Sequence, residues 1–193
     1  AGAPRGDAKN MPPPVQWPSE QVWNFARQFG KAEPDLIIKS APWTQKAGAN
    51  DAWWKPVAET GLTEPRWVRA IEMRPSTLKG RKITHHAIAR LQQQETDALA
   101  SNPTDANGHP LPGTFMEWAV GKQGEIMRPS GKLMLPGSKI VWDIHYSNGG
   151  EDITDQVELG IYFYPKGQEP KHRQVLHLLG PTSTGVLDTP RTR

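Results

Sequence analysis

The chain has 193 residues, enough for one domain with a sizeable core and an additional arm. It is 36% hydrophobic and 22% charged, as is usual for globular proteins, and its formal net charge of +3 is scattered rather than gathered in the basic patch of a nucleic-acid-binding protein. The absence of cysteine excludes disulfides, thiolate metal sites, cysteine nucleophiles and covalent haem attachment, and no window approaches the roughly 18 apolar residues of a membrane span. We therefore expect no nucleic acid as a partner and no membrane span.

The first part of the chain predicts an arm followed by a short helix. Residues 1–16 are rich in proline, glycine and charge, which is typical of a weakly ordered segment. Ser19 can cap a helix, and Gly30 can end it. Between them, apolar residues recur at helical spacing: Val22, Phe25, Ala26 and Phe29.

From residue 35 onward the pattern changes to short strands separated by turn residues. Strand-like runs lie at 36–38, 66–73, 82–91, 139–146, 157–164 and 174–179, whereas 43–54 and 92–112 read as loops. Nineteen prolines and eighteen glycines also fit a loop-rich β-protein. We predict an all-β fold, an antiparallel β-sandwich or jelly roll with a short N-terminal helix. Residues 1–34 would form the arm and helix, 35–182 the sandwich domain, and 183–193 a linker or tail.

Three histidines are candidates for a metal site. His85 and His86 are adjacent in one strand-like run, and His145 lies near the end of another. Imidazole suits copper, zinc, nickel and iron, and a site without thiolate favours copper or zinc. The alternative is that these histidines bind no metal: His85 and His86 would be surface residues, and His145 would be hydrogen-bonded under a turn.

Strand alternation supports two of these histidines and not the third. His145 falls on the polar face of its run, opposite Ile144 and Tyr146, and His86 also falls on a polar face. His85 falls on the apolar face. Since neighbouring strand residues point to opposite sides, His85 and His86 can reach one metal only through a twist, a bulge or a strand end.

Three segments carry a resemblance to a known family. They are residues 66–75 (Arg-Trp-Val-Arg-Ala-Ile-Glu-Met-Arg-Pro), 84–88 (Thr-His-His-Ala-Ile) and 135–146 (Leu-Pro-Gly-Ser-Lys-Ile-Val-Trp-Asp-Ile-His-Tyr). They resemble the amino-terminal copper domain of the copper type II, ascorbate-dependent monooxygenases, the family of the peptidylglycine and dopamine monooxygenases. The resemblance covers roughly residues 33–180 and looks most like a bacterial-type member.

The resemblance implies an electron-transfer domain that holds one copper ion through His85, His86 and His145. Hydroxylation in this family uses a second domain, which binds another copper ion through a His-x-His pair and a methionine. This chain has no His-x-His pair. The chain is therefore expected not to be a competent monooxygenase alone. Its expected partners are a second copper domain or partner subunit, with a cytochrome c as a possible electron donor, and its expected location is periplasmic or secreted.

Two rival functions remain open. One is a metal-free or structurally metallated sandwich that acts as an interaction module of a larger exported assembly, with Trp53 and Trp54 as its best exposed pair. The other is a hydrolytic zinc site, for which Glu72 and Asp143 are the only plausible general bases.

Several other residues have two interpretations each. Asp143 can orient an imidazole or stand as a solvated charge. The remaining histidines and three methionines are expected in loop, surface or core positions rather than at the metal, although a methionine could be a weak axial ligand: His109, His172, His177, Met116, Met127 and Met134.

Overall fold

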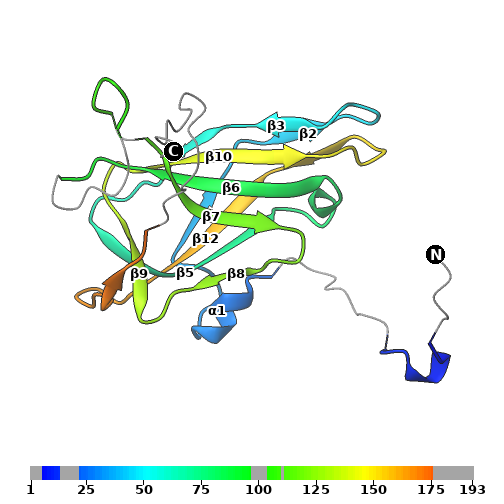
Figure 1. The fold of residues 1–193 in the computed structure, drawn as a ribbon, viewed down its shortest axis with the longest axis horizontal. Helices are drawn as coiled ribbons and strands as arrows, with labels where there is room; N and C mark the ends of the chain where they lie inside the picture. Colours follow the sequence, from blue (N-terminus) through cyan, green and yellow to red (C-terminus); the bar gives the residue numbers. More distant parts are fainter. Residues whose placement is uncertain (1–5, 14–21, 97–103, 110, 176–193) are drawn as a thin grey trace, which may run out of the picture.

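Two β-sheets packed face to face make up the body of the protein (Figure 1). The structure is a computed structural model that describes residues 6–13, 22–96, 104–109 and 111–175. All strand pairs in the described residues are antiparallel except the short contact between β13 and β9. The predicted all-β sandwich is confirmed.

The first sheet has β12 and β5 at its centre. Its strands, in spatial order, are β1 (Leu36–Lys39), β12 (Val157–Phe163), β5 (Arg66–Pro75), β9 (Ser130–Met134) and β13 (His172–Arg173), and β8 (Gly124–Ile126) also pairs with β5. Every residue of β12 is buried, because both faces of this strand are covered.

The second sheet carries the candidate site. Its spatial order is β3 (Ala52–Trp54), β10 (Lys139–Tyr146), β6 (Thr84–Gln92) and β7 (Gly113–Ala119), and β4 (Val57–Glu59) also pairs with β10. A separate ribbon joins β2 (Trp43–Gln45) to β11 (Ile153–Asp155). The loop between β2 and β3 thus starts in this ribbon and ends at the edge of the second sheet.

The main core fills the space between the two sheets. Alternate residues of β10 are fully buried and face the first sheet: Ile140, Trp142, Ile144 and Tyr146, each 0% exposed. The first sheet contributes Ile71, Leu159 and Ile161 to the same cluster. The residues that alternate with them on β10, from Lys139 to His145, are only partly buried and face outward. This is the alternation that the sequence predicts for the run 139–146.

A short helix covers the outer face of the first sheet. Helix α1 (Asn24–Gln28) packs Phe25 and Ala26 against Tyr162 and Ala70. The buried Glu72 carboxylate accepts hydrogen bonds from the backbone N–H groups of the first two helix residues, at 2.7 and 2.8 Å. The predicted helix is confirmed in a shorter form, and Ser19, its expected cap, lies outside the described residues.

The other sequence-predicted elements agree in part. The run 82–91 begins with a 3-10 turn, η2 (Gly80–Lys82), before β6 starts, and the segment 43–54 contains β2 and β3 in addition to a loop. The run 174–179 is not a strand at its first two residues, and its other four residues lie outside the described part. A second 3-10 turn, η1 (Ala8–Asn10), lies in the amino-terminal arm.

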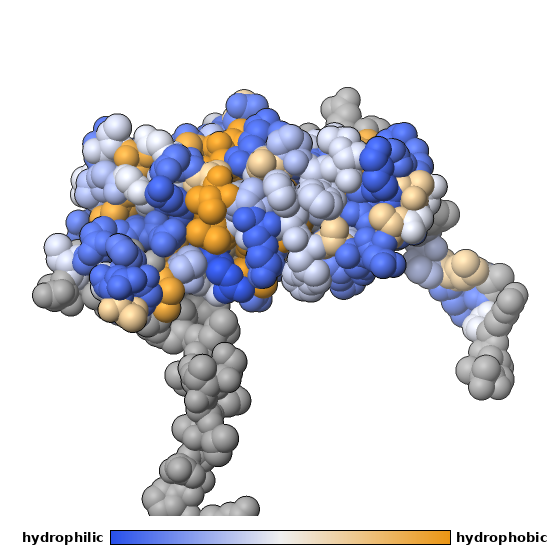
Figure 2. Space-filling view, turned by 90° about the horizontal axis from the view of Figure 1, so that it is seen from above, coloured by the Kyte–Doolittle hydropathy of each residue, from blue (hydrophilic) through white to orange (hydrophobic). Residues whose placement is uncertain are grey.

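The outer surface is largely polar. Seen from above, a narrow hydrophobic band crosses an otherwise mostly hydrophilic face (Figure 2). None of the helices within the described ranges is long and apolar enough to cross a lipid bilayer.

Candidate metal centre

A β-bulge brings two adjacent histidines to the same side of the second sheet. In the β6–β10 pair, His86 lies opposite His145 while Thr84 lies opposite Tyr146, so His85 is an extra residue without a partner on β10. A bulge reverses the alternation on one side of itself. Thr84 is accordingly buried, at 1% exposed, and its hydroxyl donates to the Gly80 carbonyl at 2.9 Å.

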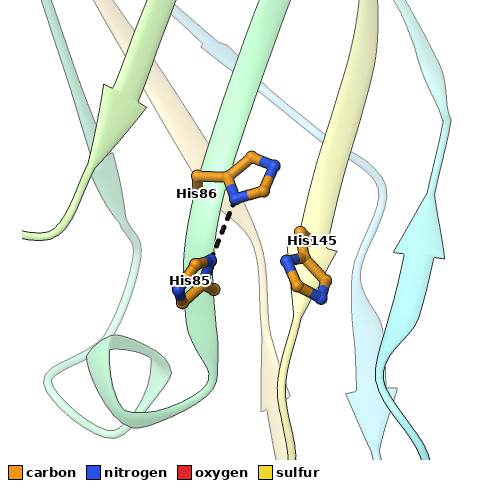
Figure 3. Close-up of side chains that lie close together, drawn as sticks. All are labelled: His85, His86 and His145. Atoms are coloured by element: carbon orange, nitrogen blue, oxygen red, sulfur yellow. Dashed lines mark hydrogen bonds between the residues drawn. The ribbon is translucent and has the colours of Figure 1, made fainter.

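The three imidazoles converge on the outer face of the sheet (Figure 3). Each ring offers one nitrogen, and these three atoms all lie within 4.8 Å of one another. The Nδ1 atoms of His85 and His86 are 3.0 Å apart, and the ring of His145 lies 5.1 and 4.9 Å from theirs, centroid to centroid. The strand-geometry obstacle posed by His85 is therefore removed by the bulge.

The imidazole of His145 is hydrogen-bonded to a carboxylate. Asp51 Oδ2 lies 2.9 Å from His145 Nε2. An ionised carboxylate only accepts hydrogen bonds, so this nitrogen carries the proton and donates. The other nitrogen, His145 Nδ1, is buried and has no hydrogen-bond partner among the described residues. It is thus left with a lone pair, which is what a metal ligand requires.

Trp53 completes one wall of the cluster. It lies opposite His145 in the β3–β10 pair, and the two rings stack at 4.6 Å with an angle of 3° between their planes. The same indole meets the edge of His86 at 5.2 Å, yet Trp53 remains 55% exposed. The predicted exposure applies to this tryptophan, whereas Trp54 is partly buried against Trp43 at 5.1 Å.

The electrostatics around His86 favour its uncharged form. Burial lowers the pKa of His86 below its ordinary 6.5, and the neighbouring rings of His145 and His85 lower it further, while Asp143 and Glu117 act in the opposite direction. Protonation would place like charges side by side. Neutral imidazole is the form that binds a metal.

Residues proposed from the sequence for other roles lie elsewhere. His109 is exposed in a loop beside Asp105, and His172 is exposed on β13. His177 lies outside the described residues. Met116, Met127 and Met134 belong to the hydrophobic core, which is the packing role expected for them.

Neither carboxylate considered as a general base has a hydrogen bond to the cluster among the described residues. Glu72 is 2% exposed and is bound to helix α1 and to the Tyr162 hydroxyl, on the other sheet. Asp143 forms ion pairs with Arg90 at 3.7 Å and Lys55 at 3.9 Å. The carboxylate that orients an imidazole is Asp51, which the sequence analysis did not single out. Nothing in the local pattern marks it, because it precedes its histidine by 94 positions.

Comparison with known proteins gives no information about this site. No protein-family model matches the chain, and neither a curated protein nor a solved structure is significantly similar to it.

Proposed function

We propose that this protein binds one copper ion through His85, His86 and His145 and serves as an electron-transfer domain. The observation that carries the proposal is the convergence of the three imidazoles from two neighbouring strands, with ligand atoms within 4.8 Å of one another.

The donor set fits a metal better than it fits a cluster of surface histidines. One nitrogen of His145 is buried with no partner among the described side chains, while its other nitrogen is engaged by Asp51. Leaving a buried polar atom unpaired costs about 1–3 kcal/mol, so such an atom calls for an explanation. A metal bond explains this unpaired nitrogen, because two other imidazoles lie beside it.

Three imidazole nitrogens without thiolate or carboxylate suit copper or zinc. Copper(II) binds nitrogen sites more tightly than the other divalent first-row metals, including zinc. A hydrolytic zinc centre also needs a base for its water; Glu72 is bound to helix α1, Asp143 is paired with Arg90, and Asp51 is engaged by His145. When bound, copper supplies a Cu(II)/Cu(I) couple that takes up and releases one electron.

The three histidines would hold the copper near the surface. His85 is exposed, and Trp53 is more than half exposed beside the cluster, so a redox partner can approach without rearrangement of the core. We infer that hydroxylation would need a second copper domain or partner subunit, with a cytochrome c as a possible donor, in the periplasm or outside the cell.

Copper titration followed by electron paramagnetic resonance tests the proposal. We expect one Cu(II) per chain, a type II spectrum with nitrogen splitting, and reversible loss of the signal on reduction by ascorbate. His86→Ala and His145→Ala should each weaken binding by more than ~100-fold, exceeding the loss expected when only a partner behind a ligand is removed. His109→Ala is the matched control, because His109 is an exposed imidazole outside the cluster.

Retention of the wild-type spectrum and affinity in both cluster variants would refute the site. Tighter binding of zinc than of copper in a direct competition would refute the choice of metal.

An interaction module is the second candidate, because two large apolar side chains stay exposed on the short strands that pair with β10, one on β3 beside the cluster and one on β4 toward the other end of β10. Trp53 and Val57 are 55% and 56% exposed. A chain that takes up no copper, and whose binding to a purified assembly component is lost in Trp53→Ser, would favour this function over the first.

A further inference from the structure

Asp51 is the one carboxylate of the described residues that hydrogen-bonds an imidazole of the cluster. It lies at the end of the loop between β2 and β3, and its side chain is about half exposed, at 53%. The imidazole that it contacts is far less exposed, at 15%. The contact therefore joins a solvent-accessible carboxylate to a ring that is largely shielded.

The loop that carries Asp51 is fastened at several points. Gln45, 1% exposed, donates its side-chain amide to the backbone carbonyl of Asn50 at 2.9 Å, immediately before Asp51. Backbone N–H groups of the same loop donate to Asp152 at 2.9 Å and to Asn148 at 3.3 Å, across the turn that follows β10. The pairing of β3 with β10 begins directly after Asp51, at Ala52, so the chain is held before and after this residue and not by the contact with the histidine alone.

The hydrogen bond decides which nitrogen of His145 is available to a metal. Nε2 donates its proton to Asp51, so the lone pair is on Nδ1, the buried nitrogen. The stacked Trp53 ring, at 3° to the imidazole, prevents the ring from tilting out of this orientation. Tautomer and ring plane are therefore both set before any metal binds.

A carboxylate behind a ligating imidazole also makes that imidazole a stronger donor. The partial negative charge that it passes to the ring stabilises the more highly charged Cu(II) more than it stabilises Cu(I). The consequence is a lower reduction potential of the bound ion.

We propose that Asp51 is a positioning residue that fixes His145 as an Nδ1 donor and lowers the reduction potential of the copper. This inference rests on the proposed function, since the potential has meaning only if copper binds at the cluster. The tautomer does not depend on copper and can be measured on the metal-free protein.

The test compares Asp51→Asn and Asp51→Ala with Asp143→Asn. The asparagine carbonyl can still accept the hydrogen bond but carries no charge, whereas alanine removes both. Asp143→Asn is the matched control: it removes one negative charge that acts on His86, from a residue with no hydrogen bond to the cluster. The half-exposed position of Asp51 allows each variant to fold, which circular dichroism can verify.

The first readout is nitrogen NMR of the imidazoles in metal-free protein at about pH 8, above the ordinary histidine pKa of ~6.5. Wild type and Asp51→Asn should show His145 protonated on Nε2 alone, while Asp51→Ala should show a mixture of tautomers. A single Nε2-protonated form in Asp51→Ala would overturn the positioning role.

The second readout is the affinity of each variant for Cu(II) and for Cu(I), which together give the potential. Asp51→Ala should lose about 10- to 100-fold in Cu(II) affinity. Asp51→Asn should keep the spectrum and lose about tenfold for Cu(II) with little change for Cu(I), which raises the potential by about 59 mV. Asp143→Asn should shift the potential less than half as much. Equal shifts in Asp51→Asn and Asp143→Asn would overturn the role of the hydrogen bond. Wild-type protein that binds no copper at these histidines would instead overturn the proposed function and leave the tautomer result standing.

Discussion

The turn that leads into β6 packs closely against Asp155 at Gly80. A Cβ added to Gly80 would lie 2.1 Å from Asp155 Cγ and 2.3 Å from each of its oxygens, where ordinary contact begins at 3.4 Å. Gly80 also accepts hydrogen bonds from the Ile83 backbone at 3.1 Å and from the Thr84 hydroxyl at 2.9 Å, one residue before the bulge. Substitution by alanine must therefore displace the carboxylate or the turn that leads to the histidines.

The size of the effect follows from what the carboxylate holds. Asp155 Oδ1 accepts hydrogen bonds from the Ser76 hydroxyl and from both the backbone and the hydroxyl of Thr77, at 2.9–3.0 Å. Each contributes a net ~1 kcal/mol, so a displacement that breaks all of them costs about 3 kcal/mol. The φ of Gly80 is not positive, so alanine should gain about 0.4–1 kcal/mol by restricting the unfolded chain. We expect Gly80→Ala to destabilise the protein by about 2–3 kcal/mol.

A double-mutant cycle with Asp155→Ala checks this reasoning. In the Asp155→Ala background the obstructing side chain is gone, so Gly80→Ala should change sign and stabilise by about 0.4–1 kcal/mol, giving a coupling of ~3 kcal/mol. Urea unfolding of the four proteins measures each term. Additive effects of the two substitutions, or a stabilising Gly80→Ala in the wild-type background, would show that the contact does not constrain the turn.

Three further predictions concern a buried acid, the helix anchor and the indole beside the cluster. Burial raises the pKa of Asp155, so the folded state binds its proton more tightly than the unfolded state does. The stability of wild type relative to Asp155→Asn should therefore fall as the pH rises through the folded-state pKa. Urea unfolding of both proteins from pH ~4 to ~7 tests the sign. Glu72→Gln should destabilise by about 2–3 kcal/mol in thermal or urea unfolding, because the charge is lost and the amide NH2 replaces one of the two oxygens that accept from two backbone N–H groups and the Tyr162 hydroxyl, which leaves at least one donor facing a donor; an effect below ~0.5 kcal/mol would refute the anchor. Copper should quench the fluorescence of Trp53, since this indole contacts two of the imidazoles; Trp53→Phe should lower the quenched fraction, whereas Trp67→Phe, on the other sheet, should not.

The sequence predicts the long central strands because their burial pattern is local. In β10, every second residue is hydrophobic and fully buried (Ile140, Trp142, Ile144 and Tyr146), and the residues between them are only partly buried, as that period requires. The short strands lack such a period. Three-residue β3 is defined by its pairing with β10, about ninety positions away, and Trp53 and Trp54 read as loop residues without that partner.

The candidate site could be predicted in its residue types and not in its geometry. The sequence shows the two adjacent histidines, and it shows the third on the polar face of a predicted strand. The bulge is not, because it arises from the register of β6 against β10, where Thr84 and His86 take consecutive partners and His85 is left over. Asp51 is equally invisible, since only the return of β3 to the edge of β10 brings it to His145.

A crystal structure of the copper-loaded protein, with the metal located by anomalous scattering, tests the central claim most directly. We predict a single copper peak on the outer face of β6 and β10, about 2 Å from one nitrogen each of His85, His86 and His145, the distance usual for metal–imidazole bonds. A peak bonded to fewer than two of these rings, or copper held only at His109 or His172, would contradict the account.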